Sequence, residues 1–217
     1  MKGDVIKTTI LATRMIANLE PSMAKALGVS PEFHSAALLT TTCDDVTYVA
    51  LDEATKRVPS EVAFAKSFYG GADNANTELA GEILGILAGP DPETVRSGLK
   101  SCIDAIENDV HFISANDEDS IIYLAHCISR TGKYLSKLAD IPEGDSLAYL
   151  IAPPLEAMFG VDAALKAADV RLCVLYEPPT ETNFGGALLT GSQSACKAAC
   201  EAFASAVEAV AEAPREI

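Results

Sequence analysis

The chain has 217 residues, of which 49% are hydrophobic and 22% are charged, and its formal net charge at pH 7 is −15. This composition is globular rather than disordered, and the length can bury the core of one large domain or of two small ones. The charge excludes nucleic acids and anionic membrane surfaces, which are bound through clustered Lys and Arg, and leaves neutral or cationic small molecules as compatible ligands.

The N-terminal segment is not typical of a targeting or membrane sequence. Asp4, Lys7 and Arg14 interrupt its apolar residues, so it contains neither the core of a signal peptide nor a membrane span. The most apolar stretch further on is broken by Pro153 and Pro154. We therefore expect a soluble cytoplasmic protein.

The first half of the chain alternates strand-like and helix-like segments. The last helix is the clearest, because its apolar residues keep helical spacing, Asp91 is placed to cap it and Pro92 fits its first turn. In chain order we expect a β-prone segment at 6–19, a strand at 35–42, a helix at 44–58, strands at 61–69 and 82–89, and a helix at 92–107.

The second half repeats this order. We expect a β-prone segment at 120–130, a strand at 146–153, a helix at 155–169, strands at 170–178 and 185–192, and a helix that begins at Gln193. Equivalent positions are separated by offsets that decrease along the chain: 110 from Asp52 to Asp162, 108 from Val62 to Val170, and 102 from Gly89 to Gly191. The first copy therefore carries six extra residues, which fall in Gly70–Gly81.

The repeat predicts an α/β (α+β) protein of two tandem domains, 1–110 and 111–217, each an antiparallel sheet with flanking helices. Two copies of one unit give each chain two similar binding edges. Such repeated edges favour assembly into a ring or layer over catalysis.

The cysteines and histidines give no sign of a metal site. None of the six cysteines forms a CxxC pair, and Cys196 and Cys200 share the apolar face of the last helix, so we interpret them as small buried hydrophobic residues. The three histidines are scattered along the chain.

Several longer segments together carry a resemblance to a known family. They are CDDVTYVALDEATK, SFYGGA, NDEDSIIYLAHCISRTGKYLS, AYLIAPPLEAMFGVDAALKAADV, PPTETNF and LTGSQSACKAAC. Over nearly its whole length the chain resembles bacterial microcompartment shell proteins with two tandem shell domains, in particular the trimeric shell proteins of ethanolamine utilization. The resemblance implies circularly permuted shell domains, a homotrimer that mimics a hexamer, and tiling with other shell proteins.

The resemblance also implies a gated pore on the three-fold axis and a smaller ethanolamine-binding pore between the two domains of each subunit. The residues that the family uses for ethanolamine align with Asp44, Asp45, Glu82, Phe112, Thr182, Asn183 and Phe184. Phe184 departs from the tyrosine expected there, which puts any contact by a phenolic hydroxyl in doubt. No cofactor is required, and cobalamin is a candidate for transport through the large pore.

The chemistry of a small ammonium ligand fits these residue types. Carboxylates suit the cation, a polar group suits the hydroxyl, and a ring offers a cation–π face. Simpler interpretations remain open: Asp44 fits a helix N-cap, and Glu82 could be solvated. With the 102 offset Glu82 matches Phe184, as facing walls of one pocket would.

The extra loop of the first copy is expected to be the gate. It contains Tyr69, Gly70, Gly71, Ala72, Asp73, Asn74, Ala75 and Asn76. Its glycines and asparagines favour a pliant backbone, whereas Pro178 and Pro179 stiffen the matching connection.

No nucleophile elbow, phosphate loop or metal-ligand spacing supports an enzyme. A soluble amine-sensing regulator of tandem ferredoxin-like domains is the alternative, and assembly separates the two because a shell protein forms extended sheets.

Overall fold

The computed structural model describes residues 1–68, 77–178, 180 and 182–215. They form two compact units: unit 1 contains Met1–Lys7, His111–Thr131 and Ser136–Ile217, and unit 2 contains Thr8–Val110 and Gly132–Leu135. These units are defined by spatial contact, and the division of the repeat into 1–110 and 111–217 stays a prediction. In the described ranges, no helix combines the length and the apolar run that crossing a membrane would need.

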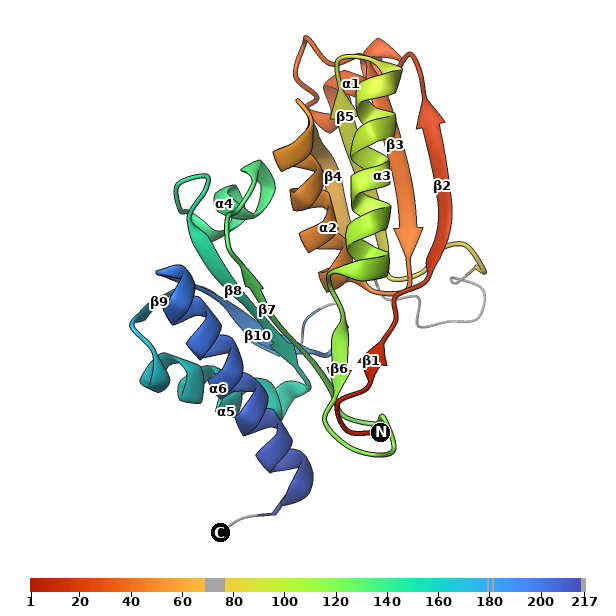
Figure 1. Ribbon diagram of the computed structural model, residues 1–217. Helices are drawn as coiled ribbons and strands as arrows, with labels where there is room; N and C mark the ends of the chain where they lie inside the picture. Colours follow the sequence, from red (N-terminus) through yellow and green to blue (C-terminus); the bar gives the residue numbers. More distant parts are fainter. Residues whose placement is uncertain (69–76, 179, 181, 216–217) are drawn as a thin grey trace. The chain divides into compact units, whose positions relative to one another are not determined.

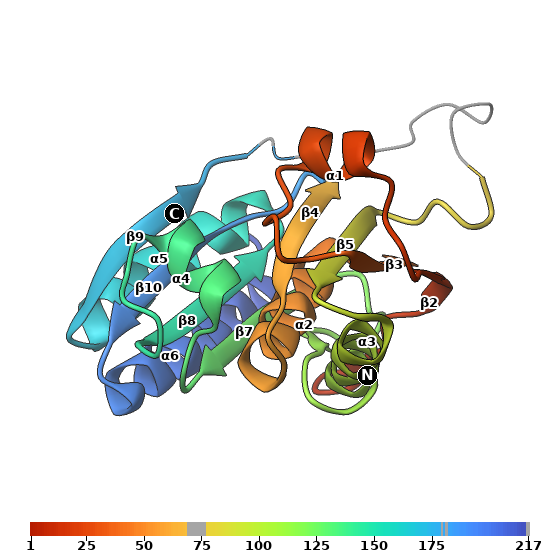
Figure 2. The same ribbon diagram turned by 90° about the horizontal axis from the view of Figure 1, so that it is seen from above.

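Unit 2 is a four-stranded antiparallel sheet with helices on both faces. Its elements are β2 (Ile10–Ile16), α1 (Pro21–Leu27), β3 (Ser35–Thr41), α2 (Asp44–Arg57), β4 (Glu61–Ser67), β5 (Ile83–Gly89) and α3 (Pro92–Asn108). The strand order is β2-β3-β5-β4. Helices α2 and α3 cover one face of the sheet and α1 lies on the other (Figures 1 and 2).

Unit 1 is built around a six-stranded antiparallel sheet in the order β1-β6-β7-β8-β10-β9. Its elements are β1 (Val5–Ile6), β6 (Phe112–Ser114), β7 (Ile122–Ile128), β8 (Ser146–Ala152), α5 (Pro154–Ala167), β9 (Val170–Tyr176), β10 (Gly185–Gly191) and α6 (Gln193–Glu212). A short helix α4 (Lys133–Ala139) follows β7, and its first residues belong to unit 2.

The internal repeat is confirmed element by element. The order β2-α1-β3-α2-β4-β5-α3 of unit 2 recurs as β7-α4-β8-α5-β9-β10-α6, and the sheet order β2-β3-β5-β4 recurs as β7-β8-β10-β9. Even the irregularities match, because both edge strands shift register at the same point, opposite Ile86 and Leu87 in β5 and opposite Leu188 and Leu189 in β10. The predicted fold class is correct.

Capping and apolar spacing explain the long helices. The Asp91 carboxylate accepts hydrogen bonds from the N–H groups of Glu93 and Thr94, both at 2.9 Å, and so caps α3 as predicted. Helix α6 buries Cys196, Cys200 and Phe203 in the core of unit 1. Cys102 is also buried, whereas Cys43, Cys127 and Cys173 are only partly buried.

The predictions were wrong at several element ends. Cys43, not Asp44, is the N-cap residue of α2, and no side chain caps this helix. The strand predicted at 61–69 ends at Ser67. Four short elements were missed: the strands β1 and β6 span only two and three residues, and the helices α1 and α4 span seven residues each, which is too short for a helical apolar period to emerge.

Candidate functional site

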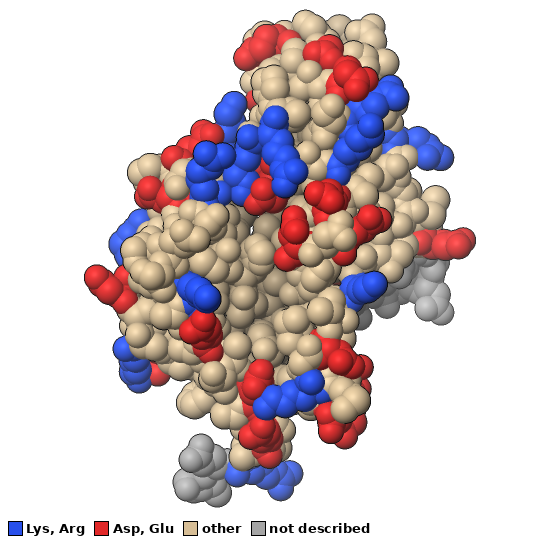
Figure 3. Space-filling model, viewed as in Figure 1, with Lys and Arg blue, Asp and Glu red and all other residues tan. Residues whose placement is uncertain are grey.

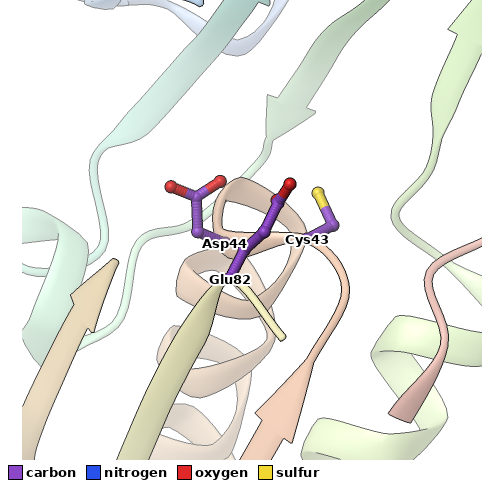
Figure 4. Close-up of side chains that lie close together, drawn as sticks. All are labelled: Cys43, Asp44 and Glu82. Carbon is purple, nitrogen blue, oxygen red and sulfur yellow. The ribbon is translucent and has the colours of Figure 1, made fainter. Parts of the chain in front are cut away.

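An acidic group lies in unit 2 where α2 begins and β5 begins. Asp44 and Asp45 form the first turn of α2, and Glu82 immediately precedes β5. The register brings them together, because the Glu82 N–H donates to the carbonyl of Thr41, the last residue of the neighbouring strand β3, at 2.9 Å. One candidate ligand atom from each of Cys43, Asp44 and Glu82 lies within 4.8 Å of the others, and the two carboxylates project from α2 and β5 on the same side (Figure 4).

The carboxylates of this group are substantially withdrawn from solvent. Asp44 is 7% exposed and Asp45 is 9% exposed, which excludes the interpretation of both as solvated surface residues. Burial, and secondarily the charge of Asp44, raises the pKa of Glu82 above its usual value. A carboxylate whose pKa is raised in this way, such as Glu82, also attracts another cation, because a cation relieves the same unfavourable burial of charge.

The dipole of helix α2 also contributes to the electrostatic environment of the acidic group. Asp44 and Asp45 lie in the first turn of α2, where the positive end of the helix dipole favours acidic residues. At the other end of the helix, Lys56 and Arg57 complement the negative pole. On the face drawn in Figure 3, basic side chains gather over α2 and α3 of unit 2, despite the net charge of −15.

The group fits an ammonium better than a transition metal. Burial and the neighbouring carboxylates raise the pKa of the Cys43 thiol well above its usual value, so that its thiolate, the form that ligates a metal, is disfavoured. Without that ligand, carboxylates at a helix N-terminus remain, and these are acceptors for N–H donors of a small cation.

The other expected site residues lie together in unit 1. The rings of Phe112 in β6 and Phe184, just before β10, are in edge-to-face contact, with centroids 5.9 Å apart and planes at 85°. Asn183 has a positive φ of 65°, and the Phe184 carbonyl accepts a hydrogen bond from the Thr180 hydroxyl at 2.8 Å. Thr182 lies in the same turn, where its N–H donates to that hydroxyl at 3.4 Å.

The positional match between Glu82 and Phe184 is confirmed. Each residue directly precedes its strand, since β5 begins at Ile83 and β10 begins at Gly185. An aromatic ring therefore stands in one copy where a carboxylate stands in the other. Whether these seven residues bind ethanolamine stays a prediction, and the expected gate residues 69–76 lie outside the described residues.

Another buried carboxylate, that of Asp52 in α2, was not singled out as a functional residue. Its two oxygens accept hydrogen bonds from the N–H groups of Gly132 and Leu135, at 2.7 and 2.9 Å. Thr55 accepts from the N–H of Lys133 at 3.1 Å, and the rings of Tyr48 and Tyr134 stack with centroids 6.1 Å apart. A Cβ at Gly132 would collide with Thr55 and lie 2.7 Å from the Asp52 carbonyl, so the contact requires glycine there. The sequence offered little signal for this role, because Asp52 is followed directly by Glu53 and the polar end of the helix.

Comparison with known proteins decides the family. No protein-family model matches the chain. The bacterial microcompartment shell protein EutL of Clostridium perfringens is 61% identical to it over 214 residues, which cover 99% of each chain. The chain belongs to the EutL family. The crystal structure of EutL from Leptotrichia buccalis is 66% identical, covers 100% of both chains and superposes with a TM-score of 0.96.

A more distant structure extends the comparison to the fold alone. The trimeric bacterial microcompartment shell protein PduB has a TM-score of 0.76 at 18% identity and covers 94% of this chain and 89% of its own. Proteins of the EutL family are shell proteins, and the chain is accordingly a structural protein of a microcompartment shell rather than an enzyme.

Proposed function

We propose that the chain forms a trimeric, hexamer-like tile of an ethanolamine-utilization microcompartment shell and that this tile packs beside other shell proteins. The observation that carries the proposal is the exact recurrence of element order and sheet order in two units of a chain that belongs to the EutL family. Three chains with two similar units each present six similar edges, which is the number a hexagonal layer needs.

The expected assembly is a closed ring of three chains. Light scattering of the purified protein should give three chain masses, because a head-to-tail contact with three-fold rotation is complete when the third chain meets the first. Electron microscopy at high protein concentration should show hexagonally packed layers. A discrete species that never forms layers would contradict the shell tile and favour the amine-sensing regulator.

The acidic group of unit 2 is the proposed ammonium site. Asp44 and Asp45 are buried and Glu82 is partly buried, and the carboxylates of Asp44 and Glu82 lie close together. Such a concentration of withdrawn negative charge favours a cationic ligand. Ethanolamine presents an ammonium with N–H donors, so that charge-assisted hydrogen bonds would hold it. The roles of Phe112, Thr182, Asn183 and Phe184 in binding the same ligand are part of this proposal.

The proposed gate is the loop of residues 69–76, and cobalamin is the proposed bulky cargo of the central pore. If ethanolamine binds preferentially to the closed form, a concentration of 100 times its dissociation constant favours closure by about 2.7 kcal/mol. Hydrogen exchange in 69–76 should then slow on addition of ethanolamine. Exchange that is as slow as in β4 and β5, with or without the ligand, would contradict a moving gate.

A further inference from the structure

The internal repeat contains a second surface like the one at Asp52, on α5, and no segment of the same chain covers it in the described residues. Helices α2 and α5 are equivalent with an offset of 110, since they begin at Asp44 and Pro154 and both contain 14 residues. Position by position, Val49 matches Phe159 and Asp52 matches Asp162. In α2 the outer face that carries Asp52 is covered by Gly132–Leu135, a segment of unit 2 that opens α4.

The equivalent face of α5 is exposed. Val49 and Asp52 are 1% and 0% exposed, whereas Phe159 is 50% exposed and Leu155, one turn before it, is 62% exposed. The Asp162 side chain is 59% exposed and pairs with Lys166 of its own helix at 2.6 Å. Two large apolar side chains one turn apart on a helix surface indicate a buried contact in the assembled protein.

The segment that would cover this face is also exposed. Helix α1 matches α4 with an offset of 112, since they begin at Pro21 and Lys133 and both contain seven residues. Leu135 of α4 is 0% exposed, but its equivalent Met23 in α1 is 40% exposed, and α1 buries none of its residues. The facing surfaces of α5 and α1 are therefore both exposed to solvent. The equivalent surfaces of α2 and of the start of α4 are both buried against each other.

We propose that the α5 face formed by Leu155, Phe159 and Asp162 binds the start of α1, Glu20–Met23, from a second copy of this chain. The contact would repeat the one made by Gly132–Leu135 on α2. It is head-to-tail, because each copy contributes α5 on one side and α1 on the other, and such a contact forms a ring when the rotation between copies closes. The proposal rests on the trimer proposed above and names the surfaces that hold it together.

The two contacts differ in chemistry. In the contact on α2, the carboxylate of Asp52 accepts the N–H groups that open α4. Helix α1 does not need such a partner, because its own Glu20 accepts from the N–H groups of Ser22 and Met23, at 2.8 and 3.1 Å. Asp162 therefore does not have to accept the N–H groups at the start of α1, and it pairs with Lys166 of its own helix. The contact between copies would consequently be held mainly by Leu155, Phe159 and Met23.

A pair of engineered cysteines tests the contact directly. In the contact on α2, the Leu135 N–H donates to the Asp52 carboxylate at 2.9 Å, so cysteines at the two equivalent positions, Met23 and Asp162, would face each other across the proposed contact. We expect Met23→Cys/Asp162→Cys to form covalent two- and three-chain species on mild oxidation. Each single variant should give no more than the background of the native cysteines, because a head-to-tail contact never places one position opposite itself.

A control pair and a second variant sharpen the test. Met23→Cys/Glu201→Cys places the second thiol on the solvent-facing side of α6, where the Glu201 side chain is 68% exposed, and should remain at background. Phe159→Asp should keep the secondary structure, since this side chain is exposed, but raise the dissociation constant of the trimer about tenfold or more.

The outcomes separate this contact from the trimer itself. A three-chain mass without specific cross-linking of the double variant, or cross-linking by Asp162→Cys alone, would overturn the contact and leave the trimer. A one-chain mass would overturn both.

Discussion

Asp52→Ala is expected to lower the free energy of unfolding by about 3 kcal/mol, and Asp162→Ala, at the equivalent position, by less than about 0.5 kcal/mol. The Asp52 side chain is 1% exposed, and its removal leaves the N–H groups of Gly132 and Leu135 without acceptors. Each buried unsatisfied donor costs about 1–3 kcal/mol. Asp162 loses only an exposed ion pair with Lys166, and such pairs contribute little.

Denaturant unfolding of the two variants measures this difference. Burial raises the pKa of Asp52 in the folded state, so the folded state gains a proton more readily than the unfolded state. The stabilisation linked to this proton is present at low pH and is lost as the pH rises through the folded pKa. The deficit of Asp52→Ala should therefore grow on acidification. Equal losses in the two variants would show that the hydrogen bonds to Gly132 and Leu135 do not anchor this segment.

Glu82→Gln and Asp45→Asn are each expected to weaken ethanolamine binding about tenfold or more, and together about a hundredfold. Each removes one negative charge from a buried group, and a hydrogen bond to a charged partner contributes about 1.5–3 kcal/mol. Titration calorimetry provides the affinities. Glu93→Gln is the matched control, since Glu93 lies in the first turn of α3 as Asp45 does in α2, but its side chain is 77% exposed.

The pH dependence of binding identifies Glu82 further. Its pKa is raised, so that it takes up a proton at a higher pH than an ordinary glutamate does. The ammonium requires the ionised form, and affinity should fall as the pH is lowered through this raised pKa. In Glu82→Gln this dependence should be lost. Unchanged affinity in both single variants would mean that the acidic group has no part in ligand binding.

The sequence was sufficient for the order of the long elements and for the repeat. Helical spacing of Val95, Leu99 and Cys102, with Asp91 before them, predicted α3 almost to the residue, because one pattern and one cap specify both its face and its start. The offset between Gly89 and Gly191 survives unchanged in the structure, since both end equivalent strands.

Local burial could not be predicted in the same way. Asp44 was expected to cap α2, since an acidic residue before an apolar run normally does, but it lies one residue inside the helix and is 7% exposed. The partner of Asp52 is about 80 residues away along the chain, in a segment that has no periodic pattern of its own. Such contacts follow from the assembled fold, and propensities of neighbouring residues carry no information about them.

The partly and fully buried cysteines have a chemical consequence for a protein that lines a barrier. All six thiols have a pKa above the usual value, and burial is the first cause in each case; for Cys102 the value is about 12 and for Cys196 about 11. Nucleophilic attack requires the thiolate, so alkylating agents and carbonyl electrophiles meet side chains that are almost entirely protonated at neutral pH. We therefore expect the native thiols to react slowly with alkylating agents in the folded protein and faster after unfolding.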